Sequence, residues 1–271
     1  MSLRPAAVTR GRLVAAAMLI VMANALGELV KAAVAGQGFF GALPTGLGVS
    51  WAVWLSLGLG VRLALTAEPA PARALDWMAA AAGIALAAVP VTGVASLGAT
   101  LIGGWFLVDP RADDRLKAAG AILVALAVNL MWSKLLLMLF ARPIENLDAG
   151  VVGLVRGVAV HGNVIDFVHG DERVAVLSGC TSVANASLAL LLWLAVTRSV
   201  RPKPVASEFG YAAALFVTIV VINLVRLSLV ADSRAAWAYW HGPVGDSVVD
   251  ALITAAAMAW AVVGARREIF R

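Results

Sequence analysis

Few residues in this 271-residue chain can do nucleophilic chemistry, and its one cysteine, Cys180, is the foremost of them. Cys180 follows Gly179, is followed by Thr181 and Ser182, and stands where an apolar run of helix length begins. The amide groups and dipole at the amino end of a helix favour a thiolate and can stabilise an oxyanion. A lone cysteine is more often a small buried hydrophobe. Such a filler is expected in mid-span, so the position of Cys180 favours a chemical role.

A polar pair lies in another apolar run, Asn223-Leu224-Val225-Arg226. Placing an arginine within an apolar helix costs about 2.5 to 3.5 kcal/mol on insertion scales, so such a residue usually faces a polar cavity or a partner. Asn223 precedes Arg226 by three residues, which puts both side chains on one face of a helix. Snorkelling to the outer interface would also explain Arg226. Two polar groups that point the same way favour a site.

His241 follows the aromatic segment Trp237-Ala238-Tyr239-Trp240. Aromatic residues of this kind anchor helices at a membrane interface, and an imidazole with an ordinary pKa of about 6.5 suits proton transfer. Asp246 either orients His241 or caps the helix that follows it. The other two histidines, His161 and His169, lie in turn-like sequences, and no chemical role is expected for them.

The whole chain is too apolar for a water-soluble domain. Hydrophobic residues make up 62% of it and charged residues 14%, against about half and about a quarter in ordinary soluble domains. Since a chain of this length leaves much of its area on the surface, its solvent must be lipid. One cysteine and three histidines show no zinc-site spacing, so neither a metal nor another cofactor is expected. The net charge of +5 comes from basic residues at the ends of apolar runs, which is typical of membrane loops and not of a nucleic-acid surface.

We expect an all-α polytopic membrane protein with about eight transmembrane helices, because roughly 20 apolar residues cross a bilayer as a helix. Six spans are evident, at about 13–34, 49–66, 118–140, 182–198, 210–230 and 247–264. The run 77–108 holds one or two more, and Pro90-Val91-Thr92-Gly93 favours a helix break. A break there puts thirteen lysines and arginines inside and four outside, whereas an undivided helix puts eight inside and nine outside. The positive-inside rule therefore selects eight spans with both termini cytoplasmic, in a multi-pass protein of the inner (plasma) membrane.

Two segments, about 141–179 and 231–246, fall outside the cytoplasm in this map. In the first, β-prone runs at 158–160, 164–168 and 174–176 alternate with turn-like sequences at 161–163 and 169–171. This alternation predicts a small extracytoplasmic β-meander before the sixth helix.

The eight-span map brings Cys180, Asn223, Arg226 and His241 to the extracytoplasmic face, although the charge count did not require it. A nucleophile, a base and a cation at one face are the components of a thiol acyl-transfer site. Cys180 would attack a carbonyl, His241 would manage protons, and Arg226 with helix amides would stabilise the oxyanion. The expected supporting residues are Asn223, Ser182 and Asp246. We divide the chain accordingly into 1–146, with the first five transmembrane helices, and 147–271, the catalytic region with the last three.

At these residues the chain resembles the exosortase/archaeosortase family of multispanning membrane cysteine transpeptidases. That family places a cysteine at the start of a span, an Asn-x-x-Arg motif in the next span and a histidine in the following outer loop, and Cys180, Asn223 to Arg226 and His241 match that order. The lead-in to the cysteine, from Gly157 through 162–165 to 174–176, is also similar. The likeness covers about 147–260, whereas the first five spans match only in being hydrophobic. Where the family commonly has Cys-Ser-Gly after an alanine, this chain has glycine, cysteine, threonine and serine at 179–182.

The resemblance implies a cysteine protease or transpeptidase that cleaves the C-terminal sorting signal of exported proteins through a thioester and transfers them to an acceptor. Its substrates would carry a tail made of a short recognition motif, one transmembrane helix and a basic cluster. The implied partners are therefore exported proteins and membrane lipid, and no nucleic acid.

A multispanning transporter or a membrane scaffold with no peptidase activity is the alternative. Glu28, Lys31, Arg62 and Lys134 lie within or at the edges of spans and could line a pathway. Glu28 and Lys31 are three residues apart and can simply pair. A rhomboid-like serine protease is disfavoured, because the sequence has no Gly-x-Ser-Gly nucleophile.

Overall fold

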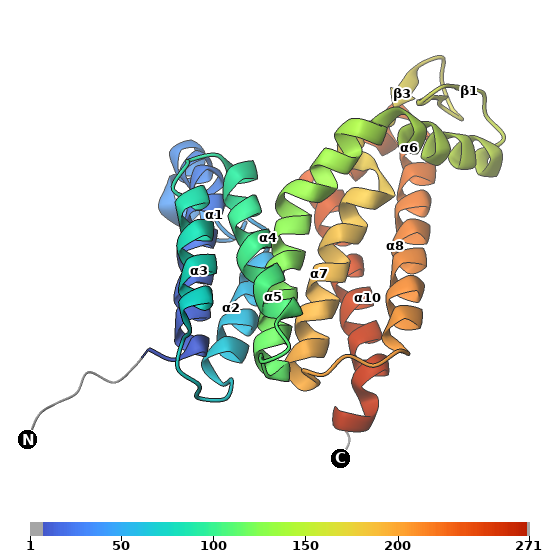
Figure 1. The fold of residues 1–271 in the computed structure, drawn as a ribbon. Coiled ribbons are helices and arrows are strands. Elements are labelled where there is room, and N and C mark those ends of the chain that lie inside the picture. Colours follow the sequence, from blue (N-terminus) through green and yellow to red (C-terminus); the bar gives the residue numbers. More distant parts are fainter. Residues whose placement is uncertain (1–7, 270–271) are drawn as a thin grey trace, which may run out of the picture. The chain divides into compact units, whose positions relative to one another are not determined.

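The computed structural model describes residues 8–269, and helices dominate it (Figure 1). In chain order the elements are α1 (Arg10–Ala42), α2 (Trp51–Leu65), α3 (Ala74–Ala87), α4 (Thr92–Val108), α5 (Asp114–Ala127), α6 (Ser133–Arg156), β1 (Val160–His161), β2 (Val164–Asp166), β3 (Arg173–Ala175), α7 (Ser182–Val200), α8 (Glu208–Val230), α9 (Arg234–Trp240) and α10 (Pro243–Ile269). A π-helical turn, Val128–Trp132, joins α5 to α6, and a single 3₁₀ turn, Ser178–Cys180, precedes α7.

Five helical stretches within the described residues are long and apolar enough to cross a membrane. They are Arg10–Ala42, Asp114–Arg156, Ser182–Val200, Glu208–Val230 and Val244–Arg266. The helices α2, α3 and α4 are apolar but contain only 15, 14 and 17 residues, fewer than the roughly 20 that a bilayer core requires. The chain therefore has the helices of a multi-pass membrane protein, and the count of eight spans stays a prediction.

The helix break expected near Pro90 is present. α3 ends at Ala87 and α4 begins at Thr92, because proline lacks an amide hydrogen and also disfavours a helical conformation of the residue before it. The two helices approach closely where Gly83 meets Gly98: a Cβ on Gly98 would lie 2.3 Å from the carbonyl oxygen of Gly83. Small residues permit such contacts between helix backbones in membranes.

The described chain forms two compact units. The first comprises the described residues of Met1–Met131, Leu194–Val205 and Ala265–Arg271, and the second comprises Trp132–Trp193 and Ala206–Gly264. These two units are groups of residues that pack together, whereas the division between residues 146 and 147 is based on the functions expected from the sequence. That functional division stays a prediction.

A buried charge cluster joins three segments of the first unit: the start of α1, the start of α3 and the end of α4. Arg10 is 4% exposed, donates from Nε to Asp76 at 2.9 Å and also pairs with Asp109. Arg73 pairs with the same two carboxylates, and the Trp105 indole donates to Asp76 at 3.0 Å. Buried charges are tolerated when they are paired and hydrogen-bonded. The cluster therefore fixes these segments against one another.

The expected β-meander is present in the second unit as a three-stranded antiparallel sheet of order β1-β2-β3. Gly162, whose φ is +68°, allows the tight turn between β1 and β2. The buried side of the sheet packs against α6 and α8 in one apolar core, which contains Ala149, Val152, Ile165, Phe167, Val174, Val176, Leu227 and Val230. This core holds the strand that leads to Cys180 against the helix that carries Arg226.

The helix α6 is bent at Phe140, whose φ of −120° and ψ of 20° lie outside the helical range, three residues before Pro143. Proline causes such bends because its ring clashes with the preceding turn and it cannot donate an amide hydrogen bond. Beyond the bend, α6 continues beneath the small sheet (Figure 1). This part exposes apolar side chains such as Leu154, at 85%, yet buries two carboxylates, Glu145 and Asp148.

Candidate active site

Cys180 lies in the short turn between β3 and α7. After Val176 enters the buried core, the chain makes one 3₁₀ turn, in which the Cys180 amide donates to the Leu177 carbonyl at 2.8 Å. α7 then begins at Ser182. Cys180 takes part in no disulfide within the described residues and is half-buried. It therefore stands just before the amino end of a long helix, where unpaired amides and the helix dipole favour negative charge.

The thiol faces the imidazole of His241. Cys180 Sγ and His241 Nε2 are 3.4 Å apart, a separation typical of a nucleophile and its base before substrate binds. His241 follows α9, and its amide donates to the Trp237 carbonyl at 2.9 Å. Its ring stacks on the Trp237 indole with centroids 5.3 Å apart and planes inclined by 27°. The helix end and the stacked indole together hold Nε2 toward the thiol.

The protonation of His241 suits a general base. Burial lowers the pKa of His241 below its ordinary value, and the Arg226 cation lowers it further, while Asp246 acts in the opposite direction. The imidazole is therefore neutral at neutral pH. Its Nδ1 atom is buried and has no hydrogen-bond partner among the described residues. If Nε2 accepts the thiol proton, Nδ1 carries a hydrogen that has no acceptor among the described residues.

Arg226 projects from α8 and contacts the chain on both sides of His241. Its Nη2 donates to the Trp240 carbonyl at 2.9 Å and to the carboxylate of Asp246 in the first turn of α10. Asp246 thus pairs with Arg226, and it makes no direct hydrogen bond to His241 in the described structure. The Arg226 side chain is 12% exposed, and its Nε is buried without a partner among the described residues. The guanidinium therefore keeps one N–H donor that has no acceptor among the described residues.

Asn223 ties the turn that contains Cys180 to α8. It is 1% exposed, and its Nδ2 donates to the Cys180 carbonyl at 2.9 Å and to the Ser182 hydroxyl at 3.2 Å. Its Oδ1 accepts a hydrogen bond from Asn185 at 3.0 Å. Since both ends of the amide are engaged, Asn223 positions the cysteine backbone and has no group left over for substrate. Ser182 shares this network.

Two buried carboxylates of α6 hold the same turn, and the sequence reasoning did not single them out. Asp148 accepts the Ser182 amide at 3.1 Å and the Ser182 hydroxyl at 3.4 Å. Glu145 accepts the Ser178 hydroxyl at 2.6 Å. Their spacing of three residues puts both on one face of α6. One feature of the sequence could have identified them: two carboxylates lie beside an apolar run. A carboxylate that is buried there needs hydrogen-bond donors from the surrounding chain.

The remaining histidines lie on exposed parts of the meander. His161 is 3.9 Å from Asp166, and His169 is 3.6 Å from Asp232, with the imidazoles 56% and 73% exposed. Neither contact involves the thiol. Among the described residues, no group of three or more histidine, cysteine, aspartate or glutamate side chains is placed to hold a metal ion.

Of the charged residues that could line a transport pathway, Glu28 and Lys31 form an ion pair of 2.8 Å. Both side chains are more than half exposed. This pair therefore neutralises itself on the helix surface, as the spacing of three residues allows.

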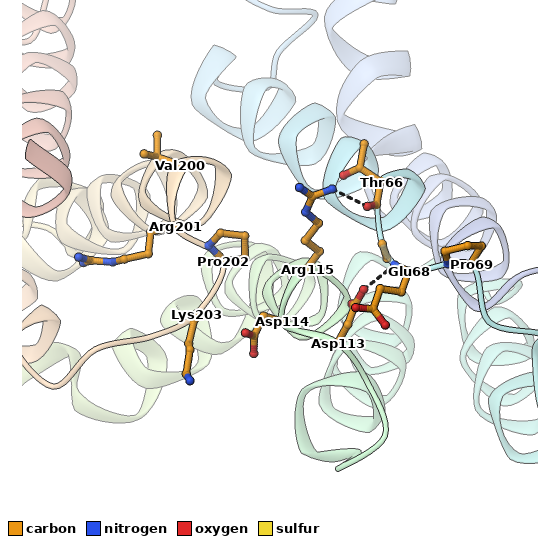
Figure 2. A pocket seen from close by; sticks show the side chains of 11 residues that line it. Thr66, Glu68, Pro69, Asp113, Asp114, Arg115, Val200, Arg201, Pro202 and Lys203 are labelled. Atoms are coloured by element: carbon orange, nitrogen blue, oxygen red, sulfur yellow. Dashed lines mark hydrogen bonds between the residues drawn. The ribbon is translucent and has the colours of Figure 1, made fainter. Parts of the chain in front are cut away.

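The first unit contains a charged cavity of about 660 Å³. It is lined by the segment after α2, the start of α5 and the segment after α7 (Figure 2). Asp113 accepts the Glu68 amide, and Arg115 donates to the Thr66 carbonyl at 2.7 Å. The lining mixes cations and anions and has neither cysteine nor histidine. This cavity thus offers no thiol and no imidazole for acyl transfer.

Comparison of the chain with models of known protein families, with curated proteins and with solved structures found no match. A function is therefore inferred from the residues of the site and their geometry.

Proposed function

We propose that this chain is a membrane-embedded cysteine peptidase or transpeptidase, similar to exosortases, that cleaves the C-terminal sorting signal of exported proteins. The observation that carries the proposal is the distance of 3.4 Å between Cys180 Sγ and His241 Nε2. The two residues are 61 positions apart and belong to different elements. A cysteine used only as a small hydrophobe needs no imidazole beside it, whereas a thiol nucleophile needs a base at this distance.

The chemistry follows from the two side chains. The Cys180 thiol gives its proton to His241 Nε2 while Sγ attacks the scissile carbonyl carbon, and the carbonyl oxygen becomes an oxyanion. When the tetrahedral intermediate collapses, the C–N bond breaks, and the imidazolium returns the proton to the departing amine. The acyl group remains on Sγ as a thioester. An acceptor nucleophile, which is a lipid amine, a glycan or water, then loses a proton to His241 and attacks the thioester carbonyl. The C–S bond breaks, and the imidazolium returns the proton to Sγ.

Arg226 supplies the positive charge of the proposed site. Its Nη2 is engaged by Trp240 and Asp246, and its buried Nε–H is unpaired among the described residues. A planar guanidinium keeps its proton in apolar surroundings and presents fixed donors to an oxygen. We assign this Nε–H to the oxyanion.

The proposal includes a topology of eight spans, with both termini in the cytoplasm and Cys180 at the extracytoplasmic face of the plasma membrane. Its support is the distribution of lysine and arginine, thirteen inside against four outside, together with the helix break between Ala87 and Thr92. The substrates are exported proteins whose tails carry a short motif, one transmembrane helix and a basic cluster.

The test uses proteins from the same genome that end in such a tail, co-expressed with the full chain. Tail release should require the thiol, so Cys180→Ala should abolish it and iodoacetamide treatment should block it. His241→Ala should also abolish release, whereas His161→Ala, a matched change at an exposed histidine, should leave it intact. Release at the parent rate by Cys180→Ala protein would exclude the proposal and favour a transporter or scaffold, which does not need its thiol.

A further inference from the structure

One edge of the small sheet has backbone groups without partners. β3 lies at the edge of the sheet and pairs only with β2 among the described residues. The Phe167 amide donates to the Glu172 carbonyl at 3.1 Å, and the Val176 amide donates to the Asn163 carbonyl at 2.8 Å. Because hydrogen bonding alternates along an antiparallel strand, residues 172, 174 and 176 face β2, and residues 173 and 175 direct their amides and carbonyls to the open side.

This open edge is accessible. Val174 and Val176 anchor the strand in the apolar core, while Arg173 and Ala175 are exposed. The Arg173 side chain turns toward β2, since its Nε lies 2.8 Å from Asp166, the residue directly opposite. It therefore leaves the edge uncovered. Unpaired backbone groups of an edge strand are a template for another strand, and near a bilayer they need water or a partner.

The same edge leads directly to the nucleophile. Ala175 is five residues before Cys180, so only residues 176–179, the last two of which belong to the 3₁₀ turn, lie between the strand and Cys180. A peptide that pairs with β3 and extends by a few residues would therefore bring a carbonyl group to Sγ.

We propose that the substrate segment on the N-terminal side of the scissile bond binds as an added strand on the open edge of β3, an inference that rests on the function proposed above. The other side of the scissile bond is excluded as the added strand, because it continues into a transmembrane helix, which satisfies its own backbone groups. Strand addition takes its affinity from main-chain hydrogen bonds and its sequence preference from alternate side chains. The short recognition motif would then be read at every second residue.

The first test uses peptide reagents, because it needs no known substrate. Pooled tetrapeptidyl chloromethyl ketones with randomised side chains are compared with iodoacetamide for the rate at which they alkylate Cys180 in the purified full-length protein. The peptides should react at least about tenfold faster than the forms that are N-methylated at an amide facing β3, since a methyl group there removes a main-chain hydrogen bond. N-methylation should matter at alternate residues only, because only every second amide of an added strand faces β3.

A variant pair gives the complementary test. Ala175→Pro removes the outward amide at a position where an edge strand tolerates proline, and Ala175→Val keeps that amide and favours strand geometry. Ala175→Pro should lose the peptide advantage and keep the parent rate with iodoacetamide, whereas Ala175→Val should keep both. If Ala175→Pro protein does not fold, the N-methyl series on the parent protein decides.

The two proposals fail in different ways. Equal rates for unmodified and N-methylated peptides, with normal labelling by iodoacetamide, would overturn strand addition alone. Tail release that does not depend on Cys180 would overturn the peptidase function, and strand addition with it.

Discussion

Replacing Arg226 by lysine separates charge from geometry at the proposed site. The parent guanidinium uses Nη2 to hold the Trp240 carbonyl and Asp246, and its buried Nε has no partner among the described residues. Lysine has a single ammonium group, and the same two acceptors would hold it. The variant would therefore keep a positive charge beside His241 and lose the N–H that we assign to the oxyanion.

The expected loss is the value of one oxyanion donor, about 10² to 10³ in kcat, or about 2.7 to 4 kcal/mol of transition-state stabilisation. KM should stay close to that of the parent, because the interaction forms only as negative charge develops on the oxygen. A residue that merely snorkels would give another result: lysine snorkels as well as arginine does, and turnover would not change.

The assay measures kcat and KM for tail release by purified protein. Arg156→Lys is the matched control, because Arg156 also pairs with a carboxylate, that of Asp232, and contacts neither the thiol nor His241 among the described residues. That control should retain parent kinetics. Near-parent kcat in Arg226→Lys would refute the assignment and leave Cys180 and His241 as the whole of the catalytic site.

Asp148→Leu should destabilise the fold by about 1 to 3 kcal/mol in thermal or denaturant unfolding, because the Ser182 amide and hydroxyl lose their buried acceptor. Asp148→Asn keeps an acceptor oxygen and should destabilise the fold less. Equal stability of the two variants would count against this role of Asp148. The pH profile of kcat/KM should fall on its acid side at a pKa below about 6.5, since the depressed pKa of His241 keeps the base neutral until that lower pH is reached. An acid limb that survives in His241→Ala protein would belong to another group. Reporter fusions should behave as exported after Glu172 and as cytoplasmic after Lys203, and the reverse pattern would exclude the eight-span map.

Local signals in the sequence predicted local features of the fold. Pro90 predicted the helix break, because the effect of proline on its own turn needs no tertiary contact. The turn-like Gly162 and the β-prone runs around it predicted the small sheet for the same reason. The number of spans was harder to predict from the sequence. The helices α2, α3 and α4 are short for a bilayer, and their hydropathy alone does not say how each one lies in lipid.

The candidate site likewise contains some residues that the sequence could identify and others that it could not. Cys180 and His241 could be found by residue type and by their positions at helix ends, and the structure places their side chains in contact. The roles of Glu145 and Asp148 depend on where the bend at Phe140 directs the second half of α6. Such long-range contacts leave no periodic pattern in the sequence, so the carboxylates that hold the turn around Cys180 could not be assigned before the fold was known.

The buried cluster around Arg10 also bears on the order in which the first unit is made. Its carboxylate partners Asp76 and Asp109 follow it by 66 and 99 residues. At about 5 to 20 residues per second, Asp76, the first of the two to be made, leaves the ribosome roughly 3 to 13 s after Arg10. A guanidinium without a carboxylate is costly to bury, so during this interval the start of α1 must stay in contact with water or lipid headgroups. The start of the first helix can thus become buried only after Asp76, in the first turn of the third helix, has been synthesised, and Asp109 completes the cluster later.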